Sequence, residues 1–181
     1  MSSRSIEILA ISGSLRAAST NTELLRACVQ LSPEDVHVRM YDGLASLPHF
    51  NADLDTEAPP PVVAGWRKQV ADADALLIAS PEYARGVPGT LKNALDWLAG
   101  STDVVAKPVA LLNGSPRATH AQDSLAVILR TISADLISEQ PYVAPVLGKS
   151  LRADDIAHDP ALCKVLRTAL DDLARAATKA T

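Results

Sequence analysis

Residues 6 to 31 read IEILAISGSLRAASTNTELLRACVQL, and this stretch decides the fold class. The apolar run over 6–11 predicts a mostly buried strand. A helix is expected over 20–31, because apolar residues recur there at helical spacing. Thr20 and Glu23 have the spacing of a capping box, which predicts that the helix begins at this point. The stretch is therefore a strand, a turn rich in hydroxyl groups, and a helix.

The rest of the chain repeats this alternation of strand and helix. Further strands are expected at 36–41, 75–79 and 109–112 and near 136–144. Helical spacing between and after them predicts four more helices. Their inward residues are expected to be Val62, Trp66, Val70 and Ala73; Leu91, Leu95 and Leu98, after Pro88 in the first turn; Leu125, Ile128, Leu129 and Ile132; and Leu162, Val165, Leu166, Ala169, Leu170 and Leu173.

The strand patterns also predict the order of the sheet. Residues 75–79 and 109–112 are continuously apolar, as in central parallel strands that are covered on both faces, whereas 36–41 alternates like an edge strand. We therefore expect an α/β fold, a doubly wound three-layer sandwich whose five-stranded parallel sheet has the flavodoxin-like order 2-1-3-4-5. The length of 181 residues fits a single domain over 1–181.

Composition excludes several classes of function. The net charge is −4 and the basic residues form no block, so a nucleic-acid binder is not expected. The first residues lack the long apolar stretch of a secretory signal, and nothing approaches the roughly 20 apolar residues of a membrane span, so we expect a cytoplasmic protein. Cys28 and Cys163 lie on apolar stripes and are expected to be buried, reduced thiols. No cluster with metal-ligand spacing occurs, so no metal site is predicted.

The order 2-1-3-4-5 places three loops together at the carboxyl edge of the sheet. These are Ser12 to Thr22, Ser80 to Pro88 and Asn113 to Thr119. The first loop has no P-loop Lys and no spaced glycines, but it offers hydroxyls, backbone N–H groups, a helix N-terminus and the cation of Arg16. Such a set suits a phosphate monoester, although capping of the helix by these polar residues explains them equally well.

The second loop, SPEYARGVPG at 80–89, favours the ligand interpretation. Its prolines and glycines fix an irregular backbone after a central strand and hold the ring of Tyr83 within it. Such a turn can present backbone groups to the edge of a flat heterocycle. A phosphate site beside a slot for a flat ring suggests a cofactor like a mononucleotide.

Two motifs carry a resemblance to a known family. GSLRAASTNTELLRA, from Gly13 to Ala27, and PEYARGVPGTLKNALDWL, from Pro81 to Leu98, resemble the NAD(P)H-dependent FMN reductases of the flavodoxin-like superfamily. The resemblance implies that the first loop holds the FMN phosphate, that the second lines the isoalloxazine ring, and that the third closes the site. The residues implied are Ser14, Arg16, Ser19, Asn21 and Thr22 for the phosphate, Pro81, Glu82, Tyr83 and Ala84 for the ring, and Gly114 and Ser115 from the third loop.

The chain departs from the family pattern at two places. Many members have Asn after PEY, where this chain has Ala84 and then Arg85, and the third loop, NGSPRATHAQ, is shorter than in many relatives and lacks their glycine pair. Arg85, Arg117 and His120 contact NAD(P)H or an acceptor on one interpretation and are solvated surface residues on the other.

The resemblance also implies an activity and an assembly. The expected enzyme is an NAD(P)H-dependent FMN or quinone reductase. Hydride passes from NADPH or NADH to N5 of FMN, and electrons then pass to a quinone, azo compound, metal oxyanion or free flavin, with no catalytic acid, base or nucleophile in the protein. The alternatives are a flavodoxin-type electron carrier and a flavin-binding dimeric module without turnover. Similar proteins form homodimers or homotetramers, and Trp97 and Leu98 are expected either at that interface or in the core.

Overall fold

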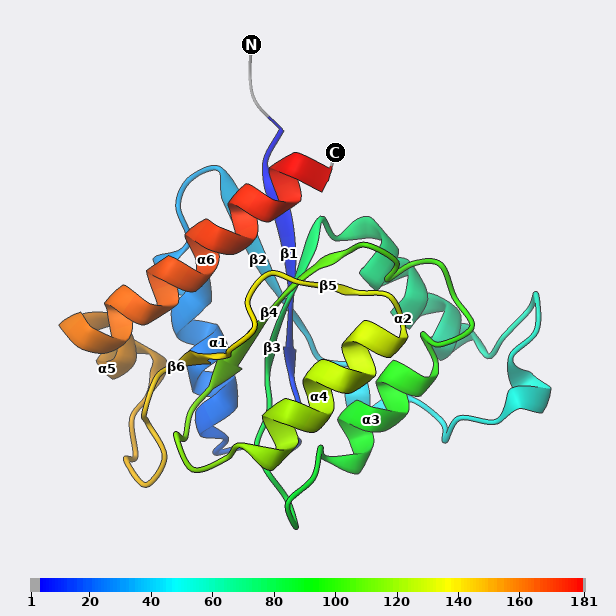
Figure 1. Cartoon of the computed structure of the whole chain (residues 1–181), viewed down its shortest axis with the longest axis horizontal. Helices are drawn as coiled ribbons and strands as arrows, with labels where there is room; N and C mark the ends of the chain where they lie inside the picture. The colour runs from blue at the N-terminus through cyan, green and yellow to red at the C-terminus, as the bar shows by residue number, and fades with distance from the viewer. Residues whose placement is uncertain (1–3, 181) are drawn as a thin grey trace.

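A parallel sheet lies at the centre of the computed structural model, which describes residues 4–180 (Figure 1). Its inner strands are β1 (Ile6–Ser12), β3 (Ala75–Ala79) and β4 (Pro108–Asn113), and β2 (Val36–Tyr41) pairs with the free side of β1. The order β2-β1-β3-β4-β5 confirms the predicted flavodoxin-like topology. All strand pairs are parallel, so their carboxyl ends meet at one edge of the sheet.

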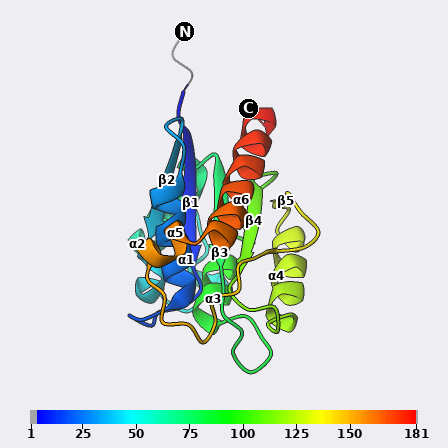
Figure 2. The same cartoon turned by 90° about the vertical axis from the view of Figure 1, so that its left-hand side faces the viewer.

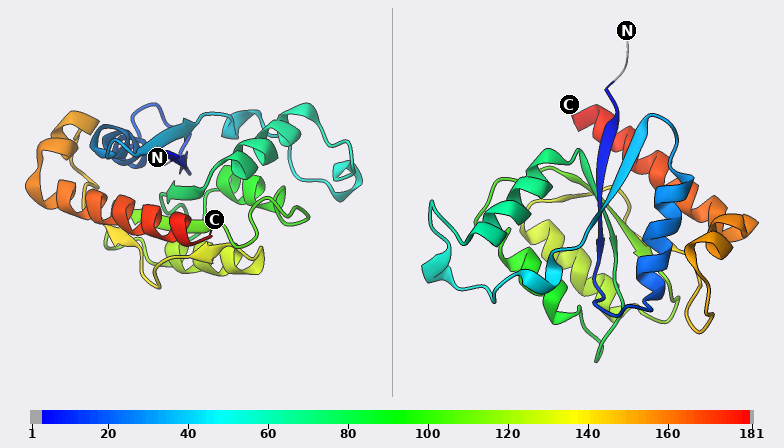
Figure 3. Two further views of the ribbon diagram at one scale, coloured as in Figure 1. Left: turned by 90° about the horizontal axis from the view of Figure 1, so that it is seen from above. Right: turned by 180° about the vertical axis from the view of Figure 1, so that it is seen from behind.

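The two faces of the sheet carry two separate apolar cores. In β3, Leu77 faces one core while Leu76 and Ile78 face the other, and all three are fully buried. This explains why the strand is apolar at every position instead of alternating. Helices α1 (Thr20–Leu31), α5 (Ala153–His158) and α6 (Pro160–Ala180) cover the first face, as Figure 2 shows. Helices α2 (Pro61–Asp72), α3 (Gly89–Asp96) and α4 (His120–Thr131) cover the second (Figure 3).

The predicted fifth strand is divided into two short strands. β5 (Asp135–Leu136) pairs with the start of β4 and β6 (Tyr142–Val143) with its end. The segment from Leu136 to Tyr142 is longer than the segment from Val109 to Leu112 of β4 that it would have to pair with. It also contains Pro141, which has no N–H to donate to a strand ladder. A single strand over 136–144 was therefore a wrong prediction, although the position of the segment at the edge beyond β4 is as expected.

One inward position also differs from the prediction. Val62 is 46% exposed, and Val63 packs into the core in its place, because either residue lies one turn before Trp66. The short helix α5 was not predicted. The remaining predicted core positions are buried or packed against the core.

The start of α1 also differs from the predicted capping box. Ser19 is the N-cap, and its hydroxyl accepts the backbone N–H of Thr22 at 3.3 Å, while Thr20 is the first helical residue. The Glu23 carboxylate accepts the backbone N–H of Ala153 at 2.8 Å and pairs with Arg26. Glu23 therefore joins α1 to α5 instead of capping its own helix.

Trp97 and Leu98 belong to the core of this chain and not to an exposed interface. Both are fully buried, and the Trp97 indole N–H donates to the carbonyl of Pro48 at 2.8 Å. Phe50 packs on the Trp97 ring with centroids 5.0 Å apart. The connection that carries these contacts contains the 3-10 turns η1 (Leu44–Ser46) and η2 (Ala52–Leu54) and extends away from the sheet (Figure 1).

The two thiols are free but differ in burial. Cys28 is fully buried as predicted, and burial raises the pKa of its thiol to about 12. Cys163 is only partly buried on α6, which corrects its prediction, and it accepts a hydrogen bond from Arg167 at 3.3 Å. Over residues 4–180, no helix is both long enough and apolar enough to cross a membrane.

Candidate functional site

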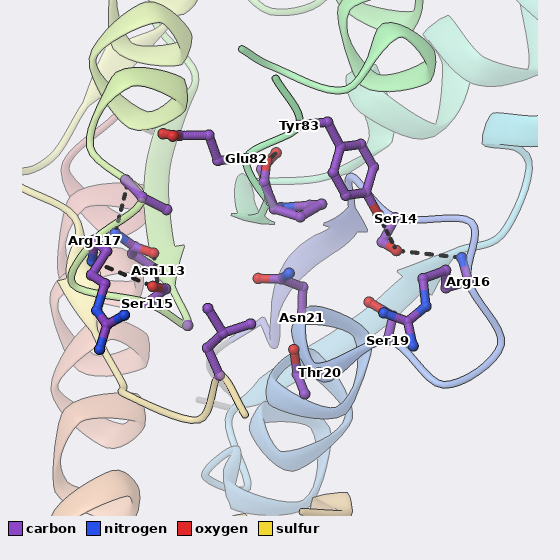
Figure 4. Close-up of a pocket in the computed structure, with 15 residues that line it drawn as sticks. Ser14, Arg16, Ser19, Thr20, Asn21, Glu82, Tyr83, Asn113, Ser115 and Arg117 are labelled. Carbon is purple, nitrogen blue, oxygen red and sulfur yellow. Dashed lines mark hydrogen bonds between the residues drawn. The ribbon is translucent and has the colours of Figure 1, made fainter. Parts of the chain in front are cut away.

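A cavity of about 290 Å³ opens at the carboxyl edge of the sheet, where the loops after β1, β3 and β4 converge. Most of the predicted site residues line it: Ser14, Arg16, Ser19, Asn21, Pro81, Glu82, Tyr83, Gly114, Ser115 and Arg117 (Figure 4). Thr20, Ser80, Asn113 and Ala118 also line it, and all four belong to the three predicted loops. Strands that are distant in sequence therefore bring these loops to one place.

The first loop surrounds the N-terminus of α1 with donors. Ser14, Ser19 and Asn21 are buried, and the Ser14 hydroxyl accepts the backbone N–H of Arg16 at 3.3 Å. In the part of the chain that the structure describes, the Arg16 guanidinium has no carboxylate partner. A free cation beside a helix N-terminus gives this wall a positive potential, which suits an anionic ligand.

Thr22 supports this loop from behind and does not line the cavity. Its hydroxyl lies 2.8 Å from the hydroxyl of Ser12, and its backbone N–H is taken by Ser19. The family resemblance implied that Thr22 holds the phosphate together with Asn21. The structure instead places it in the bonds that hold the loop on β1.

The second loop ends in a tight turn at the mouth of the cavity. Tyr83 and Gly86 exchange two backbone hydrogen bonds, of 3.1 and 2.9 Å. The two residues between them are left-handed, with φ of 50° at Ala84 and 60° at Arg85, which is the geometry of a type I′ turn. Ala84 and Arg85 therefore lie at the tip of the turn, outside the residues that line the cavity. Tyr83 lies at the rim with its hydroxyl 3.4 Å from that of Ser14 (Figure 4).

Asn113 folds the third loop over the end of β4. Its side-chain oxygen accepts the backbone N–H of Ser115 at 2.9 Å, and its amide N–H donates to the carbonyl of Ala118 at 3.2 Å. Arg117 lines the cavity and has no carboxylate partner among residues 4–180. His120 is the first residue of α4 and does not line the cavity.

Leu147 lines a fourth side of the cavity, which sequence reasoning missed. It follows β6, and its backbone N–H donates to the carbonyl of Gly114 at 3.0 Å, as does that of Val146. A side chain at Gly114 would meet Val146 at 3.2 Å and Leu24 at 3.3 Å, so the segments approach closely there. The sequence carries only a weak signal for Leu147, because this residue belongs to no helix or strand whose pattern could mark it. In the structure its side chain is 65% exposed.

The polar groups of the cavity fit a ligand that bears a phosphate. Arg16 and Arg117 outnumber the single lining carboxylate, Glu82. The side-chain oxygen of Asn21 is buried and has no hydrogen-bond partner in the described part of the chain, and Figure 4 shows this side chain between the first and third loops. A buried acceptor of this kind needs a donor such as a ligand hydroxyl. The described residues contain no group of three or more His, Cys, Asp or Glu that could hold a metal ion.

Several known proteins that resemble the chain are named as quinone reductases. An NADPH:quinone oxidoreductase of Arabidopsis thaliana is 43% identical over 112 residues, which are 60% of this chain and 57% of that protein. A 2-hydroxy-1,4-benzoquinone reductase of a Burkholderia species is 40% identical over 113 residues, 61% of each chain. The chain thus spans about 60% of the length of the curated relatives that it matches.

One solved structure matches almost the whole chain. The flavoenzyme FerB, an NAD(P)H:(acceptor) oxidoreductase of Paracoccus denitrificans, superposes with a TM-score of 0.83 and 28% identity, covering 96% of this chain and 98% of that one. Residues 6–145 match the family model described as NADPH-dependent FMN reductase, and they include all three predicted loops. The fold, the cavity and this match together establish that the chain belongs to the NADPH-dependent FMN reductase family.

Proposed function

We propose that the protein is an NAD(P)H-dependent reductase that binds FMN and passes electrons to a quinone-type acceptor. The observation that carries the proposal is the cavity itself, in which a loop suited to a phosphate monoester faces a loop suited to a flat ring. Membership of the FMN reductase family and the names of the curated relatives support the same activity.

The residues divide into a phosphate wall and a ring wall. Ser14, Arg16 and Ser19, with the first N–H groups of α1, would hold the FMN phosphate. Pro81, Glu82 and Tyr83 would line the isoalloxazine, and Gly114, Ser115 and Leu147 would close the opposite side. When bound, FMN supplies the hydride chemistry, and the protein supplies position and electrostatics.

Two arginines are candidates for contact with the nicotinamide cofactor. Arg117 lies in the cavity wall, while Arg85 is held at the exposed tip of the turn beside Tyr83. Neither has a carboxylate partner in the described residues, so both remain available to an anion. NADPH carries one phosphate more than NADH, so this pair favours NADPH as the reductant.

The visible spectrum of the pure protein tests the proposal most directly. We expect flavin absorption in protein to which FMN is added, its bleaching by anaerobic NADPH, and its return when a benzoquinone is admitted. Bleaching without recovery by the quinone would favour an electron carrier of the flavodoxin type. Protein that binds no FMN after reconstitution would overturn the proposal and favour a module without turnover.

We also propose that the chain acts as a homo-oligomer of single-domain subunits. The resemblance supports this assembly, but Trp97 and Leu98 are buried within the subunit and cannot form its surface. Light scattering coupled to size exclusion would give the number of subunits, and a mass of one chain would contradict the proposal.

A further inference from the structure

Glu82 connects the second loop of the cavity to the start of α4. One of its carboxylate oxygens accepts the backbone N–H of Ala121 at 3.0 Å, although the two residues are far apart in sequence. Figure 4 shows the Glu82 side chain directed toward that helix and away from Tyr83. The carboxylate therefore has a defined partner in the protein before any ligand is considered.

The Glu82 carboxylate supplies the hydrogen-bond acceptor that the first turn of α4 lacks. Thr119 is the N-cap residue, but its side chain caps no backbone N–H group. The first N–H groups of a helix need acceptors from outside the helix, and the end of the helix dipole there favours a negative charge. Glu82 provides both from a different segment of the chain.

A second contact joins the same two segments. The side-chain amide of Gln122, which is 3% exposed, donates to the carbonyl of Ser80 at 3.4 Å. Ser80 and Glu82 flank Pro81, so the backbone that would line the flavin ring is held at two points. Ser80 also bonds within the loop, from its hydroxyl to the carbonyl of Pro81 at 3.0 Å.

We propose that Glu82 is a positioning residue for bound flavin. By capping α4, its carboxylate fixes Pro81 through Tyr83 against the cavity. It also keeps a negative charge beside the flavin site, where that charge opposes formation of the anionic reduced flavin. This inference rests on the proposed function, because it assumes that FMN occupies the cavity.

Two substitutions separate the geometry from the charge. Glu82→Ala removes the acceptor, so we expect the exchange of the Ala121 amide hydrogen to accelerate and FMN affinity to fall, each by about tenfold. Glu82→Gln keeps an oxygen acceptor and removes the charge. Glu82→Gln should keep the exchange rate of the Ala121 amide and the FMN dissociation constant within about threefold of the wild type. It should raise the midpoint potential of the bound FMN.

Asp123→Asn is the matched control. Asp123 is an exposed carboxylate in the same helical turn, so its replacement removes an equal charge without touching the loop. We expect its FMN affinity, amide exchange and midpoint potential to remain at wild-type values. Gln122→Ala should accelerate amide exchange in the same turn, and it tests the contact even if Glu82→Ala does not fold.

The outcomes distinguish this inference from the proposed function. Hydrogen exchange is measured on protein without flavin, and the dissociation constant and potential on protein with flavin. If the wild type binds FMN while Glu82→Ala keeps its affinity and its slow exchange, the positioning role is wrong and the proposed function stands. The charge effect is wrong if Asp123→Asn raises the potential as much as Glu82→Gln does. If the wild type binds no FMN, both proposals fall.

Discussion

Arg16 is the residue on which the charge of the phosphate wall depends most. Arg16 is exposed, lines the cavity and has no carboxylate partner in the described chain, so its charge is available to an anionic ligand. We expect Arg16→Ala to weaken FMN binding by about 10- to 100-fold, the loss of one or two charge-assisted hydrogen bonds. Riboflavin has no phosphate, so its affinity should change little. Fluorescence titration with both ligands measures the difference.

Arg85 offers a control of equal charge for that experiment. It lies at the tip of the turn after Tyr83 and outside the cavity lining, so Arg85→Ala should leave the FMN dissociation constant near its wild-type value. Equal losses of FMN and riboflavin in Arg16→Ala would contradict the assignment of the phosphate to the first loop.

Ala84 carries backbone strain at the same turn. Its φ of 50° lies in the left-handed region, which costs a residue with a Cβ atom roughly 1–2 kcal/mol. We expect Ala84→Gly to raise the free energy of unfolding by about 0.5–1 kcal/mol, since relief of strain outweighs the greater entropy of glycine in the unfolded chain. Denaturant titration measures the change.

Ala99→Gly is the control that measures the effect of introducing a glycine where no backbone strain is relieved. Ala99 is exposed after α3 and is not among the residues with positive φ, so Ala99→Gly should lower the unfolding free energy by about 0.4–1 kcal/mol. A loss of stability in Ala84→Gly of the same size would show that the turn is not strained.

At the scale of elements, the close approach of the first two loops depends on Gly13. Its backbone N–H donates to the carbonyl of Ala79 at 2.8 Å, and a Cβ atom there would lie 2.8 Å from the Ser80 hydroxyl and 3.1 Å from Leu91. Gly13→Ala should therefore force the loops apart and lower stability by about 1–3 kcal/mol. Thermal unfolding measures the loss, and FMN affinity should fall with it because both loops line the cavity.

Gly65 gives the matched control on α2. It is exposed, and a Cβ atom there would meet nothing within 4 Å. Gly65→Ala should therefore stabilise the helix by about 0.5–1 kcal/mol. If Gly13→Ala were equally harmless, the contact between the first two loops would not restrict the residue at position 13.

Helices and strands were predictable where burial alone determines the spacing of their apolar residues. The bounds of α1, β2 and β3 match the prediction, because burial on one face or on two imposes distinct periodicities. The edge segment after α4 was predicted as one strand, but its division into β5 and β6 was not, and neither was the helix α5, since short elements take their form from their neighbours. Leu147 was missed for the same reason, because its place depends on the path of the chain after β6.

At the scale of the whole molecule, strand order alone brought the predicted loops together. The motifs identified most of the residues that line the cavity, but they could not show which members of a motif face it. Thr22 turns to Ser12, and Ala84 is carried outward by the left-handed turn. Such differences depend on side-chain direction and backbone torsion, which a spacing pattern does not specify.

Flavin binding should stabilise the whole molecule, because the ligand binds only the assembled cavity. A free FMN concentration 100 times the dissociation constant adds about 2.7 kcal/mol, which raises the melting temperature of a chain of this size by about 5–10 °C. Scanning calorimetry over a series of FMN concentrations measures the shift, with riboflavin as the weaker comparison. A melting temperature that is independent of FMN would contradict binding to the folded state.

The four sides of the cavity come from Ser14, Pro81, Gly114 and Leu147, so no continuous fragment of the chain contains the site. Parallel pairing joins residues of high sequence separation, and such contacts are slow to form because the long loops between them must close first. We therefore expect FMN to bind after the sheet has formed and not to nucleate the collapse of the chain. On this expectation, the rate at which FMN fluorescence is quenched during refolding reports the last step of folding.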